Sequence, residues 1–142
     1  MKRNISAGLI ITCLSAVAAL VGVIAYVVNT GTNYYAKMGV DATVLILLIV
    51  GAVVELVTIV LGLKGSSIVG DVLPVVGSVL LTVGTVLLVN ARVNNLAAVF
   101  TFENSAANMA DTTSCIVAIA ACAAAMLVSI LASFFDIPPE DA

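Results

Sequence analysis

The chain has 142 residues, of which 63% are hydrophobic and only 9% are charged, and its mean hydropathy is +1.28. Soluble domains average about 25% charged residues, and a domain this small leaves much of its surface exposed, so a water-soluble fold is excluded. The formal net charge is −3, the five Lys and Arg residues are scattered, and His is absent. These facts exclude nucleic-acid binding, His-based catalytic triads and histidine-ligated haem. We expect an integral, multi-pass membrane protein, placed most simply in a bacterial plasma membrane.

Four apolar stretches are each long enough to cross the bilayer, which takes about 20 helical residues. They cover residues 7–28, 42–63, 70–90 and 112–135 approximately. Each must be helical, because backbone polar groups in lipid are satisfied only within a helix or a closed barrel, and the alternation typical of barrel strands is absent. The sequence predicts one all-α domain, a four-transmembrane-helix bundle, followed by a short acidic tail at 136–142.

The first span has features that a signal peptide shares, since Lys2 and Arg3 precede an apolar run rich in small residues. The apolar run is about 22 residues long, whereas the apolar region of a signal peptide has about 7–15. We therefore interpret this segment as a true membrane span.

The basic residues favour one orientation of the spans. Those expected on the side of the N-terminus are Lys2, Arg3 and Lys64. Lys37 and Arg92 fall on the other side. Because short cytoplasmic loops carry an excess of Lys and Arg, this distribution predicts an N-in, C-in bundle. Its two outer loops, about 29–41 and 91–111, are small.

The second outer loop contains apolar residues at helical spacing, namely Val93, Leu96, Val99 and Phe100. Three structures are compatible with this pattern. The segment forms a short helix on the membrane surface, or it continues the third helix beyond the bilayer, or it is an ordinary loop with a few apolar residues. The sequence leaves these alternatives open.

Several residues near the ends of the spans have a structural explanation. Asp41 and Asp111 come directly before predicted helices, where an Asp side chain caps free backbone N–H groups. Asp71 lies in an early turn, where a negative charge is favourable. Pro74 falls near the first turn of the third span, where its missing N–H is harmless.

Small side chains on the fourth span predict close helix packing. Helices in lipid associate through close contact between small residues, and the fourth span has a helix-packing ridge of such residues on one face. The ridge consists of Cys115, Ala118, Cys122, Ala125, Ser129 and Ala132. The same span is rich in Ala and only weakly apolar, so we expect protein contacts on more than one of its faces. Those contacts come from the other three helices or from a different subunit.

One ionisable residue, Glu55, lies deep inside a predicted span, and it shares a helical face with Gly51 and Thr58. An ionisable side chain within the membrane is costly and is a candidate functional site. Three interpretations are open. Glu55 exchanges a proton or a cation, or it is a protonated carboxyl that makes hydrogen bonds between helices, or it pairs with a basic residue of another subunit. Thr58 is placed to hydrogen-bond a neighbouring carboxyl group.

The sequence contains no catalytic constellation, so we expect no enzyme activity, no cofactor and no metal site. Our leading hypothesis is a non-enzymatic accessory or assembly subunit of a larger membrane complex, whose partner is a transporter or a membrane-anchored enzyme. The alternative is a small proton- or cation-coupled carrier, homo-oligomeric, that uses Glu55. The expected partners are the lipid bilayer and either another membrane protein or a second copy of the chain.

Overall fold

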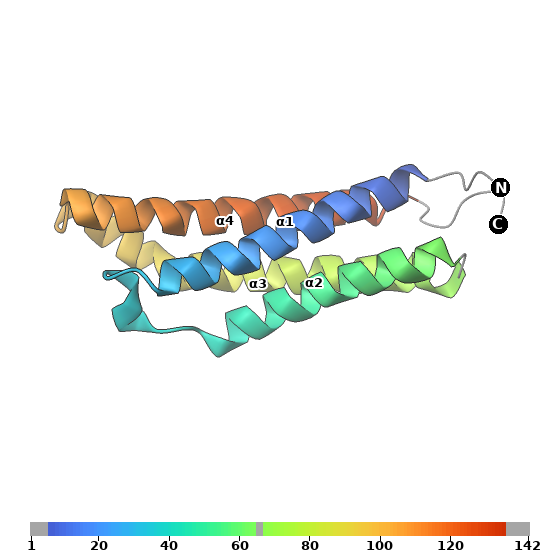
Figure 1. Cartoon of the computed structure of the whole chain (residues 1–142), viewed down its shortest axis with the longest axis horizontal. Coiled ribbons are helices and arrows are strands. Elements are labelled where there is room, and N and C mark those ends of the chain that lie inside the picture. The colour runs from blue at the N-terminus through green and yellow to red at the C-terminus, as the bar shows by residue number, and fades with distance from the viewer. Residues whose placement is uncertain (1–5, 65–66, 136–142) are drawn as a thin grey trace.

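The computed structural model describes residues 6–64 and 67–135, with the backbone alone for 67–71. These residues form four long helices and one short 3-10 helix, and they contain no strand. The elements are α1 (Ala7–Thr30), η1 (Tyr35–Met38), α2 (Ala42–Leu63), α3 (Ser67–Thr101) and α4 (Ala106–Ala132) (Figure 1). Each of the four long helices is long and apolar enough to cross a membrane. The predicted all-α fold with four spans is therefore confirmed.

The four helices lie side by side and alternate in direction (Figure 1). Helix α1 packs against α2 and α4, and α3 packs against the same two helices. One end of the bundle holds the start of α1, the end of α2, the start of α3 and the end of α4. The opposite end holds η1 and the connection between α3 and α4, and we call it the η1 end. Which side of the membrane the η1 end faces stays a prediction from the positive-inside rule.

Helix α3 is much longer than the predicted span, because it runs to Thr101 without a break. Its last turns contain neither Gly nor Pro, and Val99 is buried there. Of the three alternatives for this segment, the continuing third helix is therefore right. The 35 residues of α3 correspond to about 52 Å at 1.5 Å per residue. The helix is thus longer than a hydrocarbon core of about 30 Å.

Helix α4 begins six residues before the expected start, and this changes the role of Asp111. The N-cap is Ser105, whose Oγ accepts a hydrogen bond from the Asn108 backbone N–H at 3.1 Å. The prediction that Asp111 caps this helix is wrong, because the Ala and Met residues before it are strong helix formers and extend the helix. Asp41 does cap α2, with its Oδ1 3.0 Å from the Thr43 nitrogen.

Pro74 also differs from expectation, because α3 starts at Ser67 and the proline lies inside the helix. Its missing N–H removes one backbone hydrogen bond there, which membrane helices tolerate when neighbouring groups satisfy the freed carbonyl. The Asp71 side chain lies outside the described residues, as do Lys2, Arg3 and the acidic tail at 136–142.

The core depends on small residues that bring helices close together. A Cβ on Gly22 of α1 would lie 2.7 Å from the Cys122 Sγ of α4, and one on Gly51 of α2 would lie 2.8 Å from a Leu81 methyl of α3. All six residues of the helix-packing ridge are buried within this single chain. The ridge therefore packs against the chain's own helices.

Candidate functional site

Glu55 lies near the middle of α2 and points into the bundle, where it is only 1% exposed. Gly51 and Thr58, on the same face, are buried as well. The carboxyl lies against the backbone of α3, because a Cβ on Gly77 would be only 2.6 Å from Glu55 Oε1. Gly77 therefore makes the space that the carboxyl occupies.

The polar side chain beside the Glu55 carboxyl is that of Ser15 on α1. The Ser15 hydroxyl also donates to the Ala125 carbonyl oxygen of α4 at 3.4 Å. A hydroxyl has one proton and two lone pairs, so Ser15 can donate to Ala125 while it accepts a hydrogen bond from a protonated Glu55. Ser15 thus links α1 to both α2 and α4.

Thr58 does not provide the carboxyl contact expected from its position. Its hydroxyl donates to the Val54 carbonyl oxygen at 2.7 Å, within its own helix. Among the described residues, no basic side chain forms an ion pair with Glu55. The arrangement suits a neutral carboxyl, since an ionised carboxylate buried without a cation is costly.

A second buried ionisable residue, Arg92 of α3, lies just beyond the predicted end of the third span. It is 3% exposed. Its guanidinium carbon lies 5.7 Å from the centroid of the Tyr26 ring and 5.3 Å from that of the Tyr35 ring. Its Nη1 donates to the Met38 Sδ at 3.4 Å. Residues from α1 and η1 therefore enclose this cation of α3.

The buried face of α3 was the signal that would have found Arg92. Ser78, Thr85, Arg92 and Val99 are all buried and recur every seven residues. Extending the face of Ser78 and Thr85 past the predicted end of the span leads directly to Arg92. The predicted third span ends at about residue 90 and so does not include Arg92.

Polar contacts fix the aromatic residues around Arg92. The Tyr26 hydroxyl accepts a hydrogen bond from the Asp41 backbone N–H at 2.9 Å. The Tyr35 hydroxyl lies 3.1 Å from the Thr112 Oγ1 of α4. Burial raises the pKa of the Tyr35 phenol above its ordinary value, so the ring beside the guanidinium is neutral at physiological pH.

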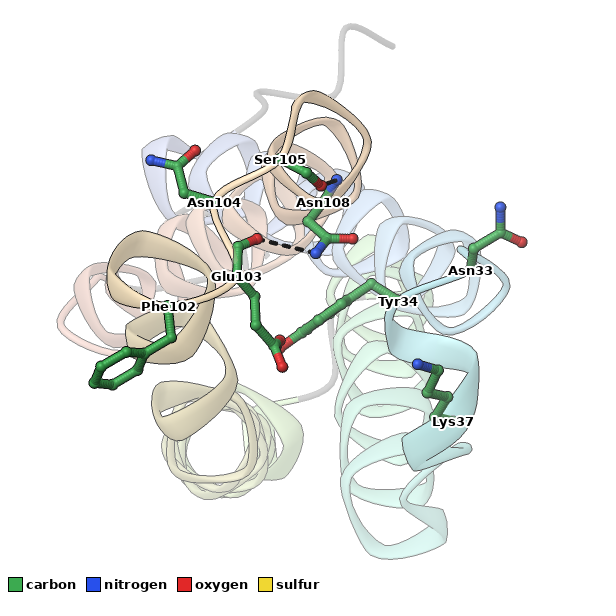
Figure 2. Close-up of a pocket in the computed structure, with 8 residues that line it drawn as sticks. All are labelled: Asn33, Tyr34, Lys37, Phe102, Glu103, Asn104, Ser105 and Asn108. Atoms are coloured by element: carbon green, nitrogen blue, oxygen red, sulfur yellow. Dashed lines mark hydrogen bonds between the residues drawn. The ribbon is translucent and has the colours of Figure 1, made fainter.

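A cavity of about 560 Å³ opens at the η1 end, between the η1 segment and the α3–α4 connection (Figure 2). It is lined by Asn33, Tyr34, Lys37, Phe102, Glu103, Asn104, Ser105 and Asn108. The Tyr34 hydroxyl donates to the Glu103 carboxylate, and this hydrogen bond raises the pKa of Tyr34 to about 12. The Tyr34 backbone N–H donates to Asp111 Oδ2 at 3.0 Å. The sequence placed loops here but gave no sign of a cavity.

Two further observations limit what can be said of the function of these sites. Among the described residues, no group of three His, Cys, Asp or Glu side chains gathers to hold a metal ion. No family model, curated protein or solved structure matches the chain.

Proposed function

We propose that the chain is a non-enzymatic accessory or assembly subunit of a larger membrane complex. Its partner, a transporter or membrane-anchored enzyme of the bacterial plasma membrane, docks at the η1 end. The observation that carries this proposal is the polar cavity of about 560 Å³ at that end, with a Phe102 side chain beside it that is 90% exposed.

The lining of the cavity has the character of a protein-binding surface. Small-molecule sites are lined mostly by apolar side chains, whereas this cavity carries amides, one Lys and one Glu. Figure 2 shows Tyr34 reaching toward Glu103, while Phe102 points away from the other side chains. Exposed aromatic residues next to polar groups are typical of non-obligate interfaces, whose partners are also stable as separate proteins.

The interior of the bundle supports the same proposal. Glu55 is 1% exposed and lies against Gly77 and Ser15. A carboxyl held in this way acts as a hydrogen-bonding group between helices. The helix-packing ridge of α4 is buried against the other helices of the chain. The surface available for a partner therefore lies elsewhere.

The test is purification of the full chain from native membranes in mild detergent, with mass spectrometry of the co-purifying proteins. We expect a second protein at fixed stoichiometry. Phe102→Ala should lower its recovery about tenfold or more, as truncation of a central aromatic contact does. Phe134→Ala is the matched control, because Phe134 is 79% exposed at the opposite end of the bundle. Recovery of the chain alone contradicts the proposal.

A second candidate function, a proton- or cation-coupled carrier, rests on Glu55 itself. A buried carboxyl without a cationic partner in the described part of the chain is the feature expected of an exchanging group within a membrane. This candidate predicts that Glu55→Gln leaves the fold intact and abolishes transport by reconstituted protein. It also predicts that the chain is recovered with itself and not with a second protein.

A further inference from the structure

The outward face of α3 carries a stripe of exposed residues with heptad spacing. One set recurs every seven residues, and each member is between 48% and 57% exposed, namely Val72, Val79, Val86, Val93 and Phe100. A second set follows the first at a distance of four residues and is exposed as well, namely Val76, Val83, Asn90 and Ala97. Alternating steps of four and three residues are the pattern of the d and a positions of a coiled coil. We call these two sets together the outer stripe.

The outer stripe lies opposite the face that α3 packs against its own bundle. Leu81, Thr85, Leu88 and Arg92 are buried on that inner face and follow the same steps of four and three residues. Helices α2 and α4 pack against α3, whereas the outer stripe stays uncovered in the described part of the chain. A seven-residue repeat is the spacing of left-handed helix packing, so α3 has the repeat for such packing on both faces.

Lipid accounts for only part of the exposure of the outer stripe. Valines that face the hydrocarbon are expected within the span itself. The part of α3 after Asn90 contains Asn94 and Asn95 and lies past the expected end of the span. Val93 and Phe100 are 48% and 51% exposed there, and Phe100 lies about 15 Å beyond Asn90 along the helix axis. The apolar stripe therefore continues beyond the bilayer, which favours a protein neighbour that follows α3 through both regions.

Asn90 is the polar residue of the outer stripe, and it indicates which protein that neighbour is. Its side chain is exposed and makes no hydrogen bond within the described part of the chain. It occupies an a position, where Asn fixes the register of a parallel pair of helices. An amide both donates and accepts hydrogen bonds, so two Asn90 side chains can pair with each other. All copies of a membrane protein insert in one orientation, so the α3 helices of two copies in contact are parallel.

A hollow beside Asn90 provides room for such a contact. It has a volume of about 430 Å³ and lies between α3 and α4. Val86, Asn90 and Val93 of the outer stripe line it, together with Ala123 and Met126 of α4. Side chains of a second α3 can enter this hollow, as knobs enter holes in a coiled coil.

We propose that the chain forms a parallel homodimer through the outer stripe of α3, with the Asn90 amides of the two copies paired across a two-fold axis. From Val72 to Phe100 the stripe runs about 42 Å at 1.5 Å per residue, so the contact extends from the membrane into water. The proposal concerns the side of α3 rather than the polar cavity, and it does not rest on the proposed accessory function.

The test is disulfide crosslinking of the full chain in native membranes. Asn90→Cys is made in a Cys13→Ala background, because Cys13 is exposed whereas Cys115 and Cys122 are buried. Mild oxidation should convert most of this protein into a dimer on a non-reducing gel, joined through the two introduced cysteines. Val28→Cys in the same background is the matched control. Val28 is 58% exposed, but it lies on α1, which packs against α2 and α4 rather than α3, so this variant should stay monomeric.

A charge on the outer stripe distinguishes a specific dimer from chance collisions. In Val93→Lys, two ammonium groups would face each other across the dimer axis. The association constant, measured by energy transfer between labelled copies in lipid vesicles, should therefore fall about tenfold or more. Ala91→Lys adds the same charge at an exposed position outside the stripe and should leave association unchanged.

Four results would overturn the proposal. They are the absence of a dimer from Asn90→Cys, an equal dimer yield from Val28→Cys, a crosslink from Asn90→Cys to a different protein, and equal association of Val93→Lys and Ala91→Lys. Circular dichroism and gel filtration check the fold of each variant. If Val93→Lys does not fold, the comparison of Asn90→Cys with Val28→Cys still decides whether a second copy lies against α3.

Discussion

Glu55 and Arg92 are both buried ionisable residues, yet their surroundings differ. Glu55 lies in the middle of the bundle between Gly77 and Ser15, and it can lose its charge by taking up a proton. Arg92 cannot lose its charge, and it lies at the η1 end between two aromatic rings. Gly77, opposite Glu55, and Arg92 are fifteen residues apart on α3, or about 22 Å, so the two charges do not neutralise each other. A buried acid can serve as a neutral packing group, whereas a buried Arg keeps its charge and depends on the groups that surround it.

The largest expected effect concerns the packing of Glu55. Gly77→Ala places a methyl group 2.6 Å from Glu55 Oε1, so it should lower the free energy of unfolding by about 1–3 kcal/mol, as overpacking does. Chemical denaturation in detergent measures the change. In a Glu55→Ala background the cost should shrink, because the obstructing carboxyl is gone. An equal cost in both backgrounds would show that the carboxyl is not what Gly77 accommodates.

Removal of the Arg92 charge should have a smaller effect of the opposite sign. Arg92→Met should raise the free energy of unfolding by about 1 kcal/mol, because it removes a buried charge that pairs with no acidic side chain among the described residues. Thermal unfolding of both proteins in detergent measures this. A variant less stable than the wild type would contradict the contrast between the two sites.

The hydrogen bonds of Ser15 should have a smaller effect. Ser15→Ala removes the contacts to Glu55 and Ala125, and interhelical hydrogen bonds in membranes are worth about 0.6 kcal/mol on average. Ser129→Ala is the control, because the Ser129 hydroxyl donates to the Met126 carbonyl oxygen within its own helix. Unfolding measurements should show a loss for the first variant and little change for the second. Equal losses would argue against a link between helices through Ser15.

The smallest expected effect is a pH dependence at the partly exposed Tyr34. Its pKa in the folded protein is about 12, against an ordinary value of 10, so the folded state holds this proton more tightly than the unfolded state. Its contribution to stability is therefore complete below pH 10 and is lost as pH rises through about 12. Thermal unfolding across this interval should show a decrease that is weaker in Tyr34→Phe. An identical decrease in both proteins would assign it to other groups.

The sequence predicted the part of the fold that hydropathy controls. The expected second span, 42–63, coincides with α2 because Asp41 caps its start and Lys64 follows its end. The extents of α3 and α4 were missed because hydropathy reports the apolar length, whereas helix formation continues through Asn94 and Asn95 and begins at Ala106.

The two candidate sites were predictable to different degrees. Glu55 could be recognised from the sequence, because a charged residue within an apolar run stands out there. For Arg92 the sequence offered only the seven-residue recurrence of the buried α3 face, because its enclosure depends on Tyr26 and Tyr35, which are distant from it in the sequence. The cavity at the η1 end likewise requires residues 33–37 and 102–108 to meet. Contacts between distant segments of this kind have no local signal.

The most direct test of the proposed accessory function is site-specific photo-crosslinking in native membranes. A photoreactive amino acid at Phe102 tests the η1 end, and the same group at Phe134 tests the opposite end. The account predicts a crosslink from Phe102 to one second protein and none to that protein from Phe134. Crosslinks from Phe102 only to lipid, or to the same protein from both positions, would contradict docking at the η1 end.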